Sequence, residues 1–79
     1  MSLYQAPKIV HPKQIKAARA LLNMSQKELG QLLGVDPRMI RFMEKRVPTQ
    51  TRKRLLLEGK LEAAGVACFA SPYVGVRYV

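Results

Sequence analysis

The chain has 79 residues, and its 14 Lys and Arg outnumber its five Asp and Glu, which gives a net charge of +9 and a pI near 10.3. This length excludes a second folding unit, and its core is small enough that we expect a homodimer, because dimerisation buries more apolar surface. The excess of positive charge predicts a polyanionic partner. The sequence lacks both an apolar run long enough to span a membrane and the pattern of a signal peptide. We therefore expect the partner to be nucleic acid and not a membrane, and the protein to lie in the cytoplasm, near the nucleoid.

Residues 1–11 show no sustained hydrophobic period, and we expect a flexible N-terminal arm. From Pro12 to about Asn23 the apolar residues fall on one helical face, which predicts a first helix. Its core residues are Ile15, Ala18 and Leu22. His11 stands directly before this helix and is expected to cap it.

A second helix is predicted between Ser25 and Gly34. Ser25 and Glu28 match a capping box, in which each side chain accepts a hydrogen bond from the other residue's backbone amide. Gly34 supplies the left-handed conformation that commonly ends a helix. The apolar residues expected on its core side are Leu29, Leu32 and Leu33.

A third helix is predicted from Pro37 to about Lys45, because Asp36 is a favourable N-cap and proline is tolerated at the first helical position. Ile40 and Met43 are expected to face the core. Two short helices joined by a tight glycine-containing turn form the unit that places its second helix in the major groove of DNA. Positive charge is concentrated in the same region, residues 36–54. The sequence therefore predicts a DNA-binding helix-turn-helix.

The segment from Ser25 to Val35, together with Ile40-Arg41-Phe42-Met43-Glu44, resembles the helix-turn-helix family of lambda repressor and Cro. The resemblance extends over about residues 12–66 and implies a DNA-binding regulator. It also implies that Arg19 and Glu44 form a structural ion pair, and that Gln26 contacts the DNA backbone or orients a base-reading side chain.

This sequence departs from the family pattern at three positions. The family often has alanine where Gly30 stands and tryptophan where Met43 stands, and both are swaps that the packing should tolerate. It often has glycine where Arg46 stands, which leaves the end of the third helix open.

A fourth helix is predicted from Pro48 and Thr49 to Gly65. Alternation in the segments 66–70 and 74–79 predicts two short strands. The expected fold is all-α, a four-helix lambda-repressor-like DNA-binding domain over residues 12–65 with a short C-terminal β-hairpin. An isolated hairpin is only marginally stable, so residues 66–79 are expected to pack on the helices, dimerise or bind a protein partner.

Four side chains of the third helix are the candidate base contacts, because arginine can donate two parallel hydrogen bonds to guanine and an apolar group can contact the thymine methyl. They are Arg38, Arg41, Phe42 and Lys45. The alternative is a solvated basic face with Phe42 tucked into the edge of the core. Seven further residues are candidate contacts to the DNA backbone, or else simply exposed polar groups: Gln26, Lys27, Arg46, Thr49, Thr51, Arg52 and Lys53.

No catalytic, metal or cofactor site is expected, since His11 and Ser25 are accounted for as caps and Cys68 as a small core residue. The sequence thus predicts a homodimeric, sequence-specific regulator that binds double-stranded DNA, either repressor or activator. One alternative is an antitoxin-like protein that binds a protein partner through residues 66–79 and uses DNA binding for autoregulation. The other is an adaptor that has kept the fold without base reading.

Overall fold

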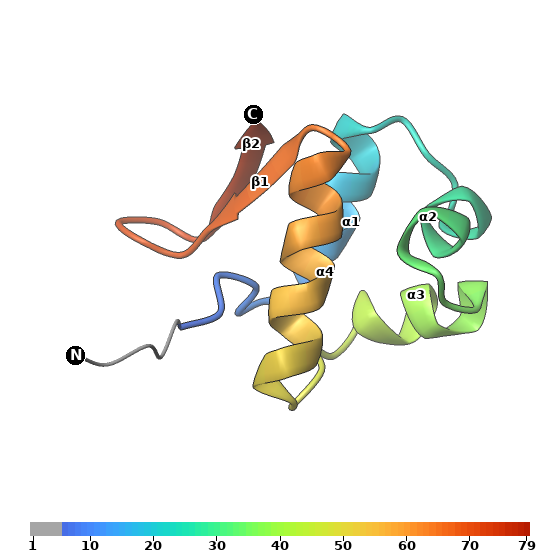
Figure 1. Cartoon of the computed structure of the whole chain (residues 1–79), viewed down its shortest axis with the longest axis horizontal. Helices are drawn as coiled ribbons and strands as arrows, with labels where there is room; N and C mark the ends of the chain where they lie inside the picture. Colours follow the sequence, from blue (N-terminus) through green and yellow to red (C-terminus); the bar gives the residue numbers. More distant parts are fainter. Residues whose placement is uncertain (1–5) are drawn as a thin grey trace.

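The computed structural model describes residues 6–79, and the chain over this range forms four helices followed by a two-stranded hairpin (Figure 1). The helices are α1 (Pro12–Leu21), α2 (Gln26–Leu33), α3 (Pro37–Met43) and α4 (Thr51–Ala63), and the antiparallel strands are β1 (Val66–Phe69) and β2 (Gly75–Tyr78). The predicted fold class is confirmed. Within the described range, no helix is both long enough and apolar enough to cross a membrane.

The first two helices begin at the predicted caps. His11 Nδ1 accepts a hydrogen bond from the Lys13 amide at 3.1 Å. Ser25 Oγ accepts from the Glu28 amide at 3.1 Å, and Glu28 Oε1 accepts from the Ser25 amide at 2.9 Å. Hydrogen bonding of the Glu28 carboxyl with Ser25, above all with its backbone amide, lowers the pKa of Glu28. The starts of both helices are therefore determined by short-range side-chain chemistry.

Three helix boundaries differ from the prediction, and the first is the end of α1, which lies at Leu21 and not near Asn23. Helix α3 ends at Met43, with Glu44 as its C-cap, so Lys45 lies in the turn that follows and not on the helix face. Helix α4 begins at Thr51, because Gln50 still has extended backbone (φ −77°, ψ 122°). Pro48 consequently lies in an irregular connection between the two helices.

The core forms where the four helices and the hairpin meet. Its fully or nearly fully buried apolar residues are Ile9, Ile15, Ala18, Leu29, Leu33, Ile40, Met43, Leu57, Leu61, Val66 and Cys68. Cys68 is a buried free thiol, as predicted. Leu32 is exposed, so its prediction as a core residue was wrong. The buried face of α2 is formed by Leu29, Gly30 and Leu33, and it includes Gly30 because the turn passes so close that a Cβ there would lie 2.7 Å from the Val35 carbonyl oxygen; Leu32 lies outside this face.

The hairpin lies against the helices, with β1 beside α4 and β2 beside α1 (Figure 1). Val66 pairs with Tyr78 and Phe69 with Gly75. The Phe69 ring covers Gly75 so closely that a Cβ there would lie 2.8 Å from the ring. Because Val66 and Cys68 are buried, strand β1 shares one core with the helices.

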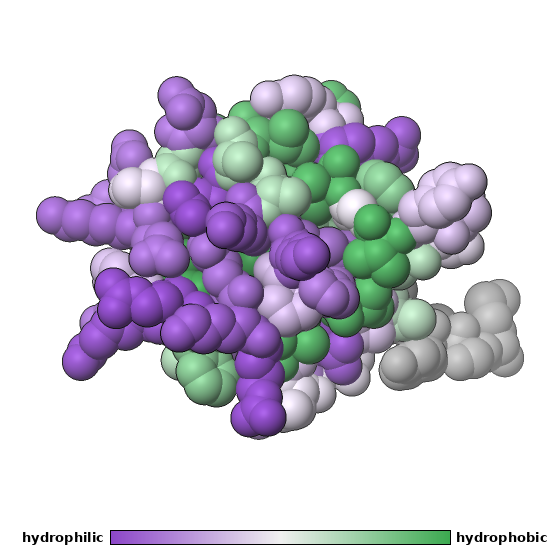
Figure 2. Space-filling model, turned by 180° about the vertical axis from the view of Figure 1, so that it is seen from behind, coloured by the Kyte–Doolittle hydropathy of each residue, from purple (hydrophilic) through white to green (hydrophobic). Residues whose placement is uncertain are grey.

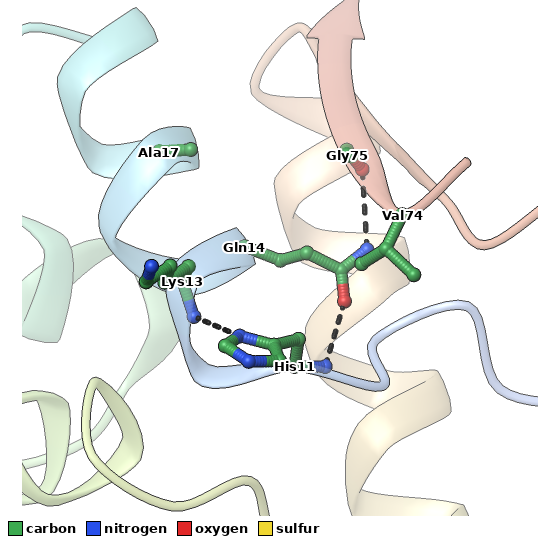
Figure 3. Close-up of a pocket in the computed structure, with 6 residues that line it drawn as sticks. All are labelled: His11, Lys13, Gln14, Ala17, Val74 and Gly75. Carbon is green, nitrogen blue, oxygen red and sulfur yellow. Dashed lines mark hydrogen bonds between the residues drawn. The ribbon is translucent and has the colours of Figure 1, made fainter.

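Gln14 is a buried polar residue, 2% exposed, whose side chain joins three parts of the chain. Its Nε2 donates to the backbone carbonyls of Lys8, Phe69 and Gly75 at 2.9–3.1 Å, and its Oε1 accepts from the amides of Val10 and His11 at 2.7 and 3.0 Å. Figure 3 shows the Gln14 side chain reaching from α1 toward Gly75, with His11 beside it.

The expected flexible arm falls partly on residues 1–5, which lie outside the described residues. The rest of it, residues 6–11, is tied to the domain. Ile9 is completely buried, and the Lys8 amide donates to Glu58 Oε1 on α4 at 3.0 Å. This segment therefore belongs to the packed domain, which its lack of hydrophobic periodicity did not indicate.

Candidate nucleic-acid interface

Helices α2 and α3 pack against each other across a turn that contains two glycine-dependent features. Gly34, at the end of α2, has φ +74°, in the left-handed region that favours glycine. At Gly30 the absence of a side chain lets the turn pass close to α2. The two helices lie together on the side of the molecule away from the hairpin (Figure 1). The turn therefore presents α3 at the surface.

Helix α3 is divided into a buried and an exposed side. Ile40 and Met43 are completely buried, as predicted. Arg38 and Arg41 are exposed, and Phe42 is 54% exposed and so is not tucked into the core. The turn after the helix adds Lys45, which is also exposed. All four candidate base contacts are therefore accessible, although Lys45 reaches the surface from outside the helix.

The Glu44 carboxylate connects the ends of α1 and α3 with the start of α2. Glu44 Oε2 accepts from Arg19 Nε at 2.8 Å and Oε1 from Arg19 Nη2 at 3.2 Å, so Arg19 and Glu44 form an ion pair. The hydrogen bonding of the Arg19 guanidinium to the Glu44 carboxylate raises the pKa of Arg19. Gln26 Nε2 donates to the same Oε1 at 3.4 Å. The orientation of Gln26, the first residue of α2, is thus linked to the end of α3.

Asp36 and Arg38 form a second ion pair at the start of α3. Arg38 Nε lies 3.2 Å from Asp36 Oδ1, and Arg38 Nη2 lies 3.4 Å from Oδ2. Oδ1 also accepts from the Arg38 backbone amide at 2.7 Å, so Asp36 caps the helix as predicted. The hydrogen bonds from Arg38 hold the pKa of the Asp36 carboxyl below its ordinary value.

The candidate contacts to the DNA backbone come from the segments before and after α3 in the chain. Gln26 and Lys27 open α2, Arg46 and Thr49 lie in the connection after α3, and the first turn of α4 carries the other three: Thr51, Arg52 and Lys53. Lys27, Arg46, Thr49 and Arg52 are exposed, whereas Gln26, Thr51 and Lys53 are half-buried.

A hollow of about 380 Å³ lies between the end of α3 and the start of α4. It brings together four of the predicted site residues: Phe42, Arg46, Thr49 and Lys53. Met39 and Gln50 also line it, and neither was predicted as a site residue from the sequence. Figure 2, seen from behind, shows hydrophilic side chains gathered on the side of the molecule that carries α2 and α3. This hydrophilic, positively charged side is the candidate interface.

A family model described as helix-turn-helix matches residues 15–57, which run from α1 into α4 and cover more than half of the chain. The matched range contains the Arg19–Glu44 pair and every candidate contact named above. No curated protein matches the chain.

Proposed function

Because the chain belongs to the helix-turn-helix family of lambda repressor and Cro, whose members are DNA-binding regulators, we propose that it is a sequence-specific regulator that inserts α3 into the major groove. The observation that carries this proposal is the division of α3, with Ile40 and Met43 buried and its basic side chains exposed. An exposed basic helix held rigidly by its other face suits the dimensions and the charge of the groove.

In this proposal the exposed residues of α3 and its following turn read the bases. Arg38 and Arg41 donate to O6 and N7 of guanine, and Lys45 makes a less rigid contact of the same kind. Phe42 contacts a thymine methyl group, which its 54% exposure leaves it free to do. Each good two-point contact discriminates between bases by about 1–3 kcal/mol.

The remaining polar residues of the interface bind phosphates and fix the register of α3 without reading sequence. They are Gln26, Lys27, Arg46, Thr49, Thr51, Arg52 and Lys53. The hydrogen bond from Gln26 to Glu44 supports this role for Gln26, because it orders the side chain before DNA arrives.

We also propose that two copies bind one pseudo-palindromic site and meet through the hairpin. The support is the exposure of large apolar side chains there, Tyr73, Tyr78 and Val79, which are 77%, 64% and 77% exposed. The same exposure favours a second candidate, an antitoxin-like protein in which this hairpin binds a different protein. Deleting residues 66–79 cannot separate the two, because it would also remove core residues such as Val66.

Tyr73→Asp and Val79→Asp test the role of the hairpin without opening the core, because both side chains are exposed. A dimer that dissociates in sedimentation experiments on these variants supports homodimerisation. A monomeric wild-type chain whose co-purifying protein is lost in the variants supports the antitoxin-like alternative.

DNA reading is tested by fluorescence anisotropy with the DNA upstream of the coding sequence and a shuffled duplex, titrated across salt concentration. We expect the upstream duplex to bind at least about a hundredfold more tightly at physiological salt. Arg38→Ala combined with Arg41→Ala should abolish that ratio, while Lys16→Ala, which removes a positive charge from the exposed face of α1, should preserve it. The wild type should also be used to select duplexes from a random-sequence library. If the selected duplex binds no more tightly than the shuffled one, the adaptor alternative is favoured.

A further inference from the structure

Arg38 differs from the other basic residues of α3 in that an acidic neighbour holds one edge of its guanidinium group. The Asp36 carboxylate contacts Nε and Nη2, at 3.2 and 3.4 Å. Nη2 carries a second hydrogen, which points to the same side as a hydrogen of Nη1, and Asp36 does not contact this Nη1–Nη2 edge. Since the Arg38 side chain is 85% exposed, this remaining edge is available to a ligand.

The free edge has the donor geometry that guanine requires. A guanidinium group is a planar fork, and its Nη1 and Nη2 can each donate one hydrogen bond in the same direction. Guanine presents O6 and N7 side by side in the major groove, and they accept such a pair. A carboxylate on one edge and a guanine on the other can therefore be bound by the same arginine at the same time.

Asp36 is itself held in place by the helix. Its Oδ1 accepts from the Arg38 backbone amide at 2.7 Å, which fixes the carboxylate against the first turn of α3. The arginine is thus tied to a group that the fold has already positioned. Among the described residues, the ion pairs are those of Arg19 and Arg38, so Arg41 and Lys45 are not restrained in this way.

We propose that Asp36 is a specificity-determining positioning residue, which orders Arg38 so that its Nη1–Nη2 edge meets guanine. The proposal rests on the proposed function, because it requires α3 to enter the major groove. An unrestrained arginine loses rotamer freedom when it binds a base, and Asp36 lowers that cost by ordering the side chain beforehand. The Asp36 carboxylate also repels phosphates, which disfavours nonspecific binding.

The test compares the wild type, Asp36→Asn, Arg38→Ala and the double variant. Asparagine is as good an N-cap as aspartate, so Asp36→Asn removes the charge and keeps the cap. The DNA is a duplex enriched by the wild-type chain from a random-sequence library, with each base pair replaced in turn. Arg38→Ala identifies the G·C pair that Arg38 reads, as the pair at which discrimination is lost.

We expect Asp36→Asn to lower discrimination at that pair by about three- to tenfold, the cost of ordering one flexible side chain. Discrimination at the other pairs should stay as in the wild type, and the double variant should be no worse than Arg38→Ala. The last comparison isolates the coupling between the two residues from any effect of Asp36 on folding.

Three results would overturn the proposal. Unchanged discrimination in Asp36→Asn, at a pair that Arg38→Ala does affect, would refute the role of Asp36 and leave the proposed function standing. Equal weakening on every duplex would make Asp36 a structural cap alone. If no sequence is enriched, or Arg38→Ala changes no base preference, the inference fails together with its premise.

Discussion

The Arg19 guanidinium binds the Glu44 carboxylate at two points, with distances of 2.8 Å (Nε–Oε2) and 3.2 Å (Nη2–Oε1). Arg19 Nη1 also donates to the Met24 carbonyl at 3.2 Å, just before α2. The two side chains of the pair are only 23% and 9% exposed. One arginine on α1 therefore holds both the end of α3 and the approach to α2, which are the parts that set the angle of α3.

Arg19→Ala should lower the free energy of unfolding by about 1–3 kcal/mol, less than for a fully buried pair, because it leaves the Glu44 carboxylate partly shielded and without its main donor. Urea denaturation followed by circular dichroism measures the change. Arg77→Ala, on the exposed face of the hairpin, is the control and should stay within about 0.5 kcal/mol of the wild type. Equal stability of the two variants would show that the ion pair contributes little.

Gln14→Leu should lower the free energy of unfolding by at least about 3 kcal/mol, because it leaves several backbone groups without a partner and each costs about 1–3 kcal/mol. The matched control is Gln31→Leu, on the exposed side of α2, which should change stability by less than about 0.5 kcal/mol. Hydrogen exchange should show faster exchange at the Val10 and His11 amides in Gln14→Leu. Protection as in the wild type at those amides would argue against the hydrogen bonds to Gln14.

Gly30→Ala and Gly59→Ala should have opposite effects, although both glycines lie within helices. At Gly30 the new methyl group would lie 2.7 Å from the Val35 carbonyl oxygen, so the turn must move, at a cost of about 1–3 kcal/mol. At Gly59 a Cβ would meet no atom within 4 Å apart from its chain neighbours and its own helix backbone, so alanine should stabilise α4 by up to about 1 kcal/mol. Thermal unfolding compares the melting temperature of each variant with that of the wild type. A higher melting temperature for Gly30→Ala would show that the turn adjusts freely.

Stability should fall as pH rises from about 9 to about 11, because burial raises the pKa of the Cys68 thiol from its ordinary value of 9.0 to about 11. The unfolded chain releases the thiol proton first, so ionisation of Cys68 favours unfolding in this window. Alkylation by iodoacetamide at neutral pH should be slow and should accelerate with denaturant. Cys68→Ala should lose this component of the pH dependence, and fast alkylation of the native chain would contradict the buried, neutral thiol.

Arg52→Ala should weaken binding to all duplexes by a similar factor and lower the slope of log K against log salt by about one, as expected for a phosphate contact. Arg41→Ala should instead reduce the preference for the selected duplex over the shuffled one. Anisotropy titrations at several salt concentrations separate the two effects. A loss of base preference in Arg52→Ala would place α4 among the reading elements.

The features that the sequence predicted correctly depend on residues close together in the chain. Ser25 and Glu28 define a capping box by their spacing alone, and Asp36 before Pro37 marks the start of α3. The burial of Ile40 and Met43 follows from helical periodicity. The exposed side of α3 was therefore predictable without knowledge of the rest of the fold.

The features that were missed depend on contacts between distant parts of the chain. Ile9 lies in an aperiodic segment, and its burial arises only from the packing of the N-terminal segment on the domain. Leu32 has the right spacing for the core, but the buried face of α2 is centred on Leu29, Gly30 and Leu33, with the turn packed against Gly30. The pairing of Asp36 with Arg38 could have been suspected, because the two are separated by one residue, yet only the side-chain geometry shows which edge of the guanidinium is occupied.

The position of Gln14 has a consequence for the order in which the domain can form. Its hydrogen-bond acceptors on Phe69 and Gly75 are 55 and 61 residues further along the chain, so they are synthesised long after α1. Until the hairpin docks, the side chain of Gln14 must remain hydrated, which keeps the N-terminal part of the core open to water. We therefore expect docking of the hairpin and closure of the core to occur together, after the closure of a loop of more than fifty residues.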